Sequence, residues 1–154
     1  MIVAVIPARA GSKRIVNKNI KKFKGLPIIA WPIKAAIKSN LFDRIIVSTD
    51  SKKIADIAKK FKAEVPFIRP KKISGDYAST ASVIKHSINE LKAKKINPKF
   101  ICCIYPTAVF MKPEDLRKGY KKIKTLKWEY VFSAGRFYSS ILRSFKKNNY
   151  GGLK

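Results

Sequence analysis

Short runs dominated by apolar residues set the strongest limit on how this chain can fold. Three of them lie at residues 2–6, 44–48 and 100–104. Continuous apolar runs of this length are typical of strands buried on both faces of a parallel sheet. A weaker run at 130–133 and a proline-interrupted run at 65–68 predict two further strands.

Helical patterns lie between these runs. Pro32 requires its helix to begin shortly before it, because proline is tolerated only in a first turn. Asp50 or Ser51 is expected to cap the next helix, and the Ser79–Thr80 region to open the third. Proline and acids at residues 113–115 suit the first turn of the fourth. Apolar residues with a helical period fall at residues 29–37, 54–61, 83–91 and 116–123.

The alternation of strands and helices indicates the fold class. Such alternation favours right-handed βαβ units, so we predict an α/β protein with a Rossmann-like, three-layer arrangement. Its sheet is expected to be mostly parallel, with helices on both faces. Ligands of such sheets bind beyond the carboxyl ends of the strands. This rule nominates the loops at residues 7–19, 48–51, 69–80 and 105–112.

The net charge of +26 comes from 35 lysines and arginines against 9 acidic residues. A field of this sign attracts anions, including nucleic acids, phosphorylated metabolites and acidic sugars. It is also the result expected of a lysine-rich composition with solvated side chains on every helix. We favour the second interpretation over a nucleic-acid-binding module, because the chain has no groove-reading motif and no aromatic stacking signature.

The sequence offers little material for a metal site or a histidine-based triad. His86 is the only histidine. Cys102 and Cys103 are adjacent on a predicted strand and point to opposite faces, so we expect two small buried hydrophobic residues. Residues 1–6 lack the features of a signal peptide, and no apolar stretch reaches the roughly 20 residues of a membrane span. We therefore expect a cytoplasmic protein.

The loop after the first run is small and basic. Residues 7–14 match neither the Walker P-loop nor the dinucleotide fingerprint in spacing. Small residues let backbone N–H groups approach a triphosphate, and cations offset the charge of departing pyrophosphate. An ordinary basic surface loop is the alternative. The small residues are Ala8, Ala10, Gly11 and Ser12, and the cations are Arg9, Lys13, Arg14 and Lys18.

An ordered series of motifs resembles the acylneuraminate cytidylyltransferases, the CMP-sialic acid synthetase family. The motifs lie at residues 6–14 with Lys18 and Asn19, at 42–50, at 69–70, at 76–80 and at 106–107. Within that family, residues 105–110 and 139–145 look most like the pseudaminic acid cytidylyltransferases.

The resemblance implies a nucleotidyltransferase fold and transfer of CMP from CTP to an acidic nonulosonic sugar, with Mg²⁺, in cell-surface glycan biosynthesis. It implies a nucleotide-binding domain over residues 1–134 and the start of a sugar-binding and dimerisation region over 135–154. The family's main magnesium ligands are expected beyond residue 154, so the fold is expected to be incomplete at its C-terminus. Accordingly, the chain is expected to bind CTP weakly and to turn over poorly. We expect a homodimer at full length, with no nucleic-acid or membrane partner.

Residue roles follow from the resemblance by position. Tyr105 replaces a glutamine of the sialic acid branch, which points to another acceptor sugar; a deoxy-octulosonate is the alternative. Arg69 has a surface-cation alternative, and Phe110 is expected in the core. Arg9 and Lys13 correspond to catalytic positions. The nucleotide-binding set is Ala8, Arg9, Ala10, Gly11, Ser12, Lys13, Lys18, Asn19, Arg69, Asp76 and Thr80, and the sugar-binding set is Tyr105, Pro106 and Thr107.

Overall fold

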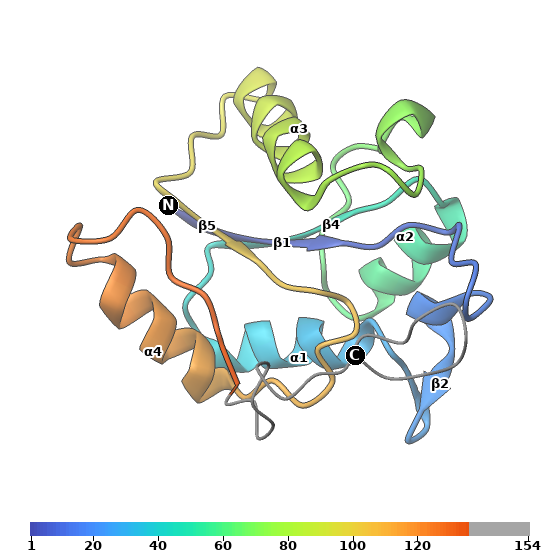
Figure 1. Ribbon diagram of the computed structural model, residues 1–154, viewed down its shortest axis with the longest axis horizontal. Helices are drawn as coiled ribbons and strands as arrows, with labels where there is room; N and C mark the ends of the chain where they lie inside the picture. Colours follow the sequence, from blue (N-terminus) through green and yellow to red (C-terminus); the bar gives the residue numbers. More distant parts are fainter. Residues whose placement is uncertain (136–154) are drawn as a thin grey trace, which may run out of the picture.

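The computed structural model describes residues 1–135, and a parallel three-stranded sheet lies at its centre (Figure 1). β1 (Ile2–Pro7) is the middle strand, between β4 (Arg44–Ser48) and β5 (Phe100–Cys103). Both neighbours run parallel to β1; Ile6 pairs with Val47 on one side. The three strands predicted from the apolar runs are therefore confirmed.

Helices fill the connections, and their starts follow the capping signals in the sequence. The Ser51 and Ser79 hydroxyls each accept a hydrogen bond from a first-turn N–H, so Ser51 rather than Asp50 is the cap of its helix. Pro32 lies in a first turn, as predicted. The α-helices are α1 (Ala30–Ser39), α2 (Lys52–Lys60), α3 (Thr80–Ala93) and α4 (Pro113–Ile123), and the 3₁₀ helices are η1 (Lys18–Ile20) and η2 (Lys71–Ile73).

Helices cover both faces of the sheet, which gives the predicted three layers (Figure 1). On one face, Val5 and Ile46 pack with Leu91 of α3. On the other, Ile6 and Val47 belong to the larger core cluster, to which α1, α2 and α4 also contribute. Both faces of β1 and β4 are thus buried, which explains their apolar runs.

The strand predicted at residues 65–68 does not form. Only the preceding Glu64 pairs, in an isolated parallel bridge with Ile46. Pro66 follows two residues later and has no N–H to donate to a ladder, so the pairing cannot extend.

The strand predicted at residues 130–133 is also absent from the described part of the chain. Tyr130 and Phe132 are 83% and 84% exposed. Aromatic and β-branched residues favour a strand only where neighbouring side chains cover them, and here none does. The local pattern alone was therefore misleading.

The predictions of buried side chains at Cys103 and Phe110 are wrong as well. Cys103 is exposed and Cys102 half-buried, because within residues 1–135 β5 pairs on one side only. Burial raises the pKa of the Cys102 thiol to about 11. Phe110 is 80% exposed, and its ring lies edge-on to that of Phe23 with centroids 6.0 Å apart.

A short hairpin follows η1 and was not predicted. It consists of β2 (Lys22–Phe23) and β3 (Leu26–Pro27), which are antiparallel. Its turn residues Lys24 and Gly25 have φ angles of 46° and 80°. Two consecutive positive φ angles are what a tight two-residue hairpin turn requires.

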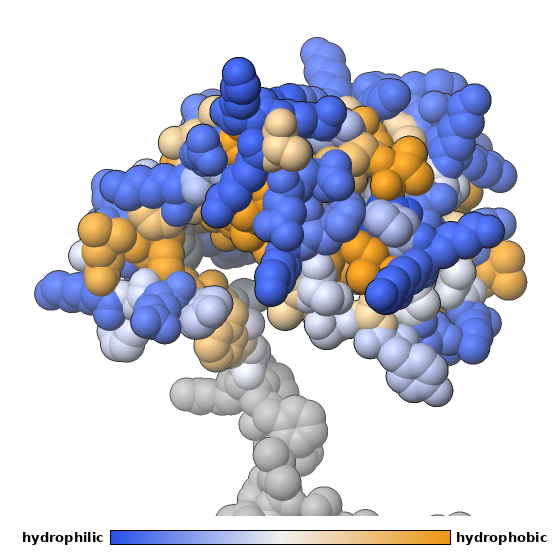
Figure 2. All heavy atoms as spheres, turned by 90° about the horizontal axis from the view of Figure 1, so that it is seen from above, coloured by the Kyte–Doolittle hydropathy of each residue, from blue (hydrophilic) through white to orange (hydrophobic). Residues whose placement is uncertain are grey.

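The face of the molecule seen in Figure 2 is predominantly hydrophilic. In the view of Figure 2, hydrophilic side chains cover most of the face, and smaller hydrophobic areas lie between them. Within residues 1–135, no helix combines the length and the apolar character needed to cross a bilayer. The second predicted region, residues 135–154, lies outside the described residues apart from Gly135, as does the motif at 139–145.

Candidate functional site

A cleft of about 170 Å³ lies beyond the carboxyl ends of β1 and β5. Three of the four nominated loops line it, at residues 7–19, 69–80 and 105–112. The fourth loop, at residues 48–51, holds a cleft residue in place, because the Thr49 carbonyl accepts a hydrogen bond from the Arg69 N–H at 2.8 Å. Of the predicted site residues, those lining the cleft are Arg9, Ser12, Lys18, Asn19, Arg69, Thr80, Tyr105, Pro106 and Thr107.

Ala8 and Ala10 do not present open N–H groups, contrary to the expectation from the sequence. Ala8 is fully buried, and its N–H donates to the Ser48 carbonyl at 2.9 Å. The Ala10 N–H donates to Oδ1 of Asp50, also at 2.9 Å. Asp50 therefore holds the first loop against β4, and both alanines have acceptors within the protein.

Gly11 has open space around it, and Lys18 brings a positive charge to the cleft. A Cβ at Gly11 would meet no atom within 4 Å, so the packing of the described residues does not itself require glycine there. Lys18, the first residue of η1, lines the cleft and makes no ion pair within residues 1–135. A ligand that approaches the backbone closely and carries negative charge would use both features.

Asn19 joins the first loop to the cleft wall. Its side chain is buried, and Nδ2 donates to the Arg9 carbonyl at 2.8 Å. Its Oδ1 is buried and has no donor within the described residues. An unpaired buried carbonyl oxygen is costly, so a donor that reached it would stabilise the site.

Arg69 is the most deeply buried cation of the site, with 4% of its surface exposed. Its Nε donates to the Ser74 hydroxyl at 3.1 Å, and that hydroxyl donates to the Pro70 carbonyl at 2.9 Å. Burial lowers the pKa of the Arg69 guanidinium, while the charge of Asp50 opposes the shift. Arginine stays charged at such a site, so the surface-cation interpretation is excluded by its burial.

Arg9 and Lys13 converge on one carboxylate at the edge of the cleft. Oδ1 of Asp76 lies 2.6 Å from Arg9 and Oδ2 lies 2.7 Å from Lys13. Hydrogen bonds from Lys13 and then Arg9 lower the pKa of Asp76. The Lys13 side chain is 84% exposed and stands at the rim rather than in the cleft lining.

The predicted acceptor side is linked to the start of α3. The Thr80 and Tyr105 hydroxyl oxygens are 3.0 Å apart and share a hydrogen bond. Pro106 is buried beneath the cleft, and Thr107 is exposed beside it. The loop after β5 therefore contacts Thr80, one of the residues predicted to bind the nucleotide.

The described residues do not fit a magnesium site by themselves. No group of three His, Cys, Asp or Glu side chains within residues 1–135 is placed to hold a metal ion. The two carboxylates nearest the first loop, Asp50 and Asp76, are engaged with Ala10 and with two cations.

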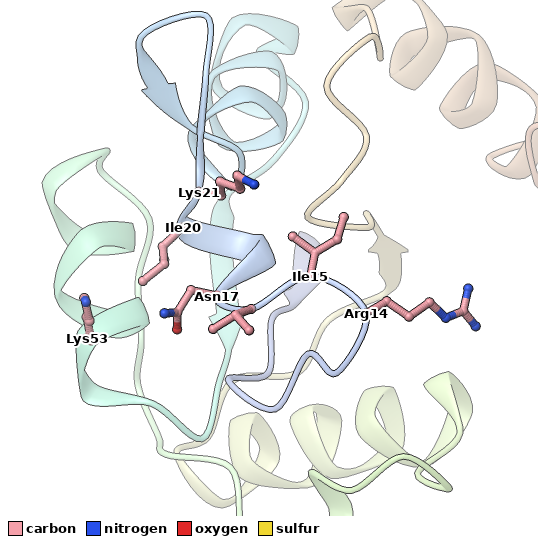
Figure 3. A pocket seen from close by; sticks show the side chains of 7 residues that line it. Arg14, Ile15, Asn17, Ile20, Lys21 and Lys53 are labelled. Carbon is pink, nitrogen blue, oxygen red and sulfur yellow. The ribbon is translucent and has the colours of Figure 1, made fainter.

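A wider hollow of about 590 Å³ lies beside the cleft, where the first loop enters η1 (Figure 3). Residues 14–17, Ile20 and Lys21 line it together with Lys53 of α2. Figure 3 shows the Arg14 side chain pointing away from Lys53. Arg14, a candidate phosphate cation from the sequence, thus belongs to this hollow and not to the cleft.

Sequence reasoning missed several parts of the site. Pro7, Ala78 and Val83 also line the cleft, and Asp50 anchors its loop. Pro7 and Ala78 lie inside two nominated loops, and Val83 begins the apolar stripe of α3 just after the second of them, so these positions were the signals that could have found them. No local pattern distinguishes Asp50 from a helix cap.

The fold and the cleft define an α/β protein with a basic loop and a buried arginine at the carboxyl ends of parallel strands, the usual place for a nucleotide. The sequence model of the family described as cytidylyltransferase matches residues 3–149, so the chain belongs to the cytidylyltransferase family. The resemblance stated from the motifs is thereby confirmed.

Two curated relatives and a solved structure refine this assignment. Pseudaminic acid cytidylyltransferase of Campylobacter jejuni serotype O:2 is 37% identical over 146 residues, 95% of this chain and 63% of the relative. CMP-N,N'-diacetyllegionaminic acid synthase of Legionella pneumophila is 43% identical over 120 residues, 75% of this chain and 50% of the relative. The chain thus spans only part of the length of each relative.

A solved CMP:2-keto-3-deoxy-manno-octonic acid synthetase, complexed with CTP, superposes with a TM-score of 0.68. The match covers 80% of this chain and 47% of the other, at 18% identity. A likeness at this identity concerns the fold alone. The predicted nucleotidyltransferase fold is confirmed.

Proposed function

We propose that this chain carries the CTP-binding part of an enzyme that transfers CMP from CTP to an acidic nonulosonic sugar, with release of pyrophosphate. The observation that carries the proposal is the convergence of three loops on one cleft that contains a buried arginine and a basic loop. The names of the Campylobacter and Legionella relatives support pseudaminic or legionaminic acid as the class of acceptor.

The cations of the first loop are proposed to hold the triphosphate. Arg9 and Lys18 line the cleft, and Lys13 stands at its rim. Fixed positive charge of this kind stabilises the negative charge that develops as pyrophosphate leaves. Transfer of a nucleotidyl group depends largely on positioning and electrostatics, so a site without a protein nucleophile is sufficient.

Arg69 and Asn19 are proposed to hold the nucleoside. Both are buried, and together they offer a charged donor and an unpaired amide oxygen. Cytidine carries donors and acceptors on its base and ribose that such groups can satisfy. A site with buried polar groups rejects ligands that leave those groups unpaired, which favours selectivity among nucleotides.

The acceptor sugar is proposed to enter beside Tyr105, Pro106 and Thr107, which follow β5. The hydrogen bond between Tyr105 and Thr80 would then connect the acceptor side to the nucleotide side. Magnesium, cytoplasmic location and a homodimer at full length are part of the proposal through the family resemblance. The roles proposed above for the cleft residues do not depend on any of these three features.

The test is the affinity of CTP measured by titration calorimetry on two double variants. The first double variant, Arg9→Ala with Lys13→Ala, removes one arginine and one lysine at the cleft. The second, Arg14→Ala with Lys53→Ala, removes one arginine and one lysine at the neighbouring hollow. Charged hydrogen bonds contribute roughly 1.5–3 kcal/mol each, so the first variant should lose at least about tenfold in affinity.

The second double variant is the control for the loss of positive charge in a chain of net charge +26. It should lose less than about threefold, because screened charges that do not touch the ligand contribute little. UTP, ATP and GTP should each bind more weakly than CTP. Equal losses in the two double variants, or equal binding of all four nucleotides, would contradict the proposal.

A further inference from the structure

Three hydrogen-bond donors of the first loop are already engaged by carboxylates. Asp50 accepts the N–H of Ala10, and Asp76 contacts both Arg9 and Lys13. The chain has only 9 acidic residues against 35 basic ones. Two of these few acids nevertheless lie against the one loop whose composition suits phosphate.

The two carboxylates differ in how firmly they are held. Asp50 sits between β4 and the Ser51 cap of α2 and is thus fixed at both sides by regular elements. Asp76 lies in the loop between η2 and α3, and its side chain is 35% exposed. A Cβ at the neighbouring Gly75 would meet no atom within 4 Å, and Tyr77 is fully exposed. The Asp76 segment therefore has room to move away from the first loop.

We infer that Asp76 is an internal competitor for the phosphates: it occupies Arg9 and Lys13 in the free protein and must leave when a triphosphate binds. The inference rests on the proposed function, because it takes Arg9 and Lys13 as phosphate ligands. Its contacts of 2.6 and 2.7 Å have the length of charge-assisted hydrogen bonds, the kind that a phosphate oxygen would form. One carboxylate and one phosphate cannot both use these donors in the same geometry.

The competition makes Asp76 a specificity residue for the phosphate tail. A triphosphate brings more negative charge than one carboxylate and displaces it. A nucleoside without phosphates reaches the Arg69 side of the cleft and leaves the Asp76 contacts intact. Asp76 therefore raises the amount of negative charge that a ligand needs in order to occupy the first loop.

The experiment compares Asp76→Asn with Asp56→Asn, using inorganic tripolyphosphate and cytidine as separate probes without added metal. Asp56 is an exposed residue of α2 that makes no ion pair within residues 1–135, so it controls for the loss of one negative charge. Asp76→Asn should bind tripolyphosphate about fivefold more tightly, since surface ion pairs of this kind are modest in strength. Asp56→Asn should change the affinity less than about twofold, and cytidine should bind all three proteins equally.

Asp76→Ala and Asp76→Glu complete the series. The alanine variant should bind tripolyphosphate as tightly as Asp76→Asn does. The glutamate variant should bind tripolyphosphate about as weakly as the unchanged protein. In the Arg9→Ala, Lys13→Ala background, Asp76→Asn should bring no gain. A gain that persists in that background, or an Asp76→Asn variant that binds tripolyphosphate no better than Asp56→Asn, overturns the inference.

Failure of the proposed function has a different signature. In that case Arg9→Ala with Lys13→Ala leaves the CTP affinity unchanged. If that double variant weakens CTP while Asp76→Asn brings no gain, the proposed function stands and the competition by Asp76 does not.

Discussion

The cleft and the neighbouring hollow are both basic, and both use the segment between β1 and β2, yet they are built differently. Three loops from distant parts of the sequence line the cleft. The hollow is lined by residues 14–17, Ile20 and Lys21 of one short segment, together with Lys53. The hollow is the larger of the two, at about 590 Å³ against about 170 Å³.

Burial of polar groups marks the second difference. The cleft contains Arg69 and Asn19, each 4% exposed, whereas the hollow exposes Ile15 and Val16 to 45% and 76%. Burying a charge or an amide is costly unless something compensates for it. In a chain with so many lysines, positive charge therefore says little about where a ligand binds, and buried polar groups from several loops say much more.

The largest expected effect contrasts two arginines. Arg69→Lys keeps the charge but removes the planar guanidinium, and it should weaken CTP binding by at least about tenfold. Arg14→Lys in the hollow should change the CTP affinity by less than about twofold. Titration calorimetry measures both. Similar losses of CTP affinity in the two variants would contradict the assignment of CTP to the cleft rather than to the hollow.

Two lysines in neighbouring turns give the next contrast. Lys18 lines the cleft and Lys21 lines the hollow. Lys18→Ala should weaken CTP about fivefold, because a cation next to a phosphate is worth about 1 kcal/mol in water-exposed surroundings. Lys21→Ala should have little effect at the same ionic strength. A larger loss of CTP affinity in Lys21→Ala than in Lys18→Ala would indicate that the phosphates bind at the hollow.

A smaller effect concerns folding stability and two asparagines. Asn19→Ala removes the hydrogen bond to the Arg9 carbonyl and should lower the free energy of unfolding by about 0.8 kcal/mol. Asn17→Ala places alanine at a φ of 54°, where asparagine is tolerated, and should cost about 0.5 kcal/mol through backbone strain. Urea denaturation measures both. Only Asn19→Ala should also weaken CTP.

The smallest effect is a pH dependence at the edge of the cleft. Lys13 and Arg9 lower the pKa of Asp76, so their ion pairs stabilise the fold fully above the ordinary aspartate pKa of about 3.9. This stabilisation is lost as the pH falls through the lowered pKa of the folded state. The difference in unfolding free energy between the unchanged protein and Asp76→Asn should therefore shrink as the pH falls from 6 to about 3. A difference that stays constant would mean that the Asp76 ion pairs do not contribute.

Much of the fold could be predicted because its signals are local. The β1, β4 and β5 runs are apolar on both faces, and Ser51 and Ser79 mark helix starts. Some failures concern contacts between distant segments. Residues 130–133 have a strand-like composition but no neighbouring strand in the described part of the chain, and Phe110 meets Phe23 at the surface instead of entering the core.

The candidate site was predictable to a similar degree. The loops after β1 and β5 follow from the rule for parallel sheets, and the motifs placed Arg9, Lys18 and Arg69 on the cleft. The burial of Arg69 and the role of Asp50 could not be read from the sequence. Both depend on which segments the fold brings together. Asp50 follows β4, and it meets Ala10 because the first loop follows the neighbouring strand β1.

The central position of β1 has a consequence for how the protein is made. β1 leaves the ribosome before both of its partners, and one of them, β5, is synthesised late in the described chain, with Ile2 paired to Phe100. Contacts between residues so far apart close large loops and form slowly. The first loop therefore cannot take its final shape early in translation, and the nascent chain must hold the apolar β1 segment without a complete sheet until β5 has emerged.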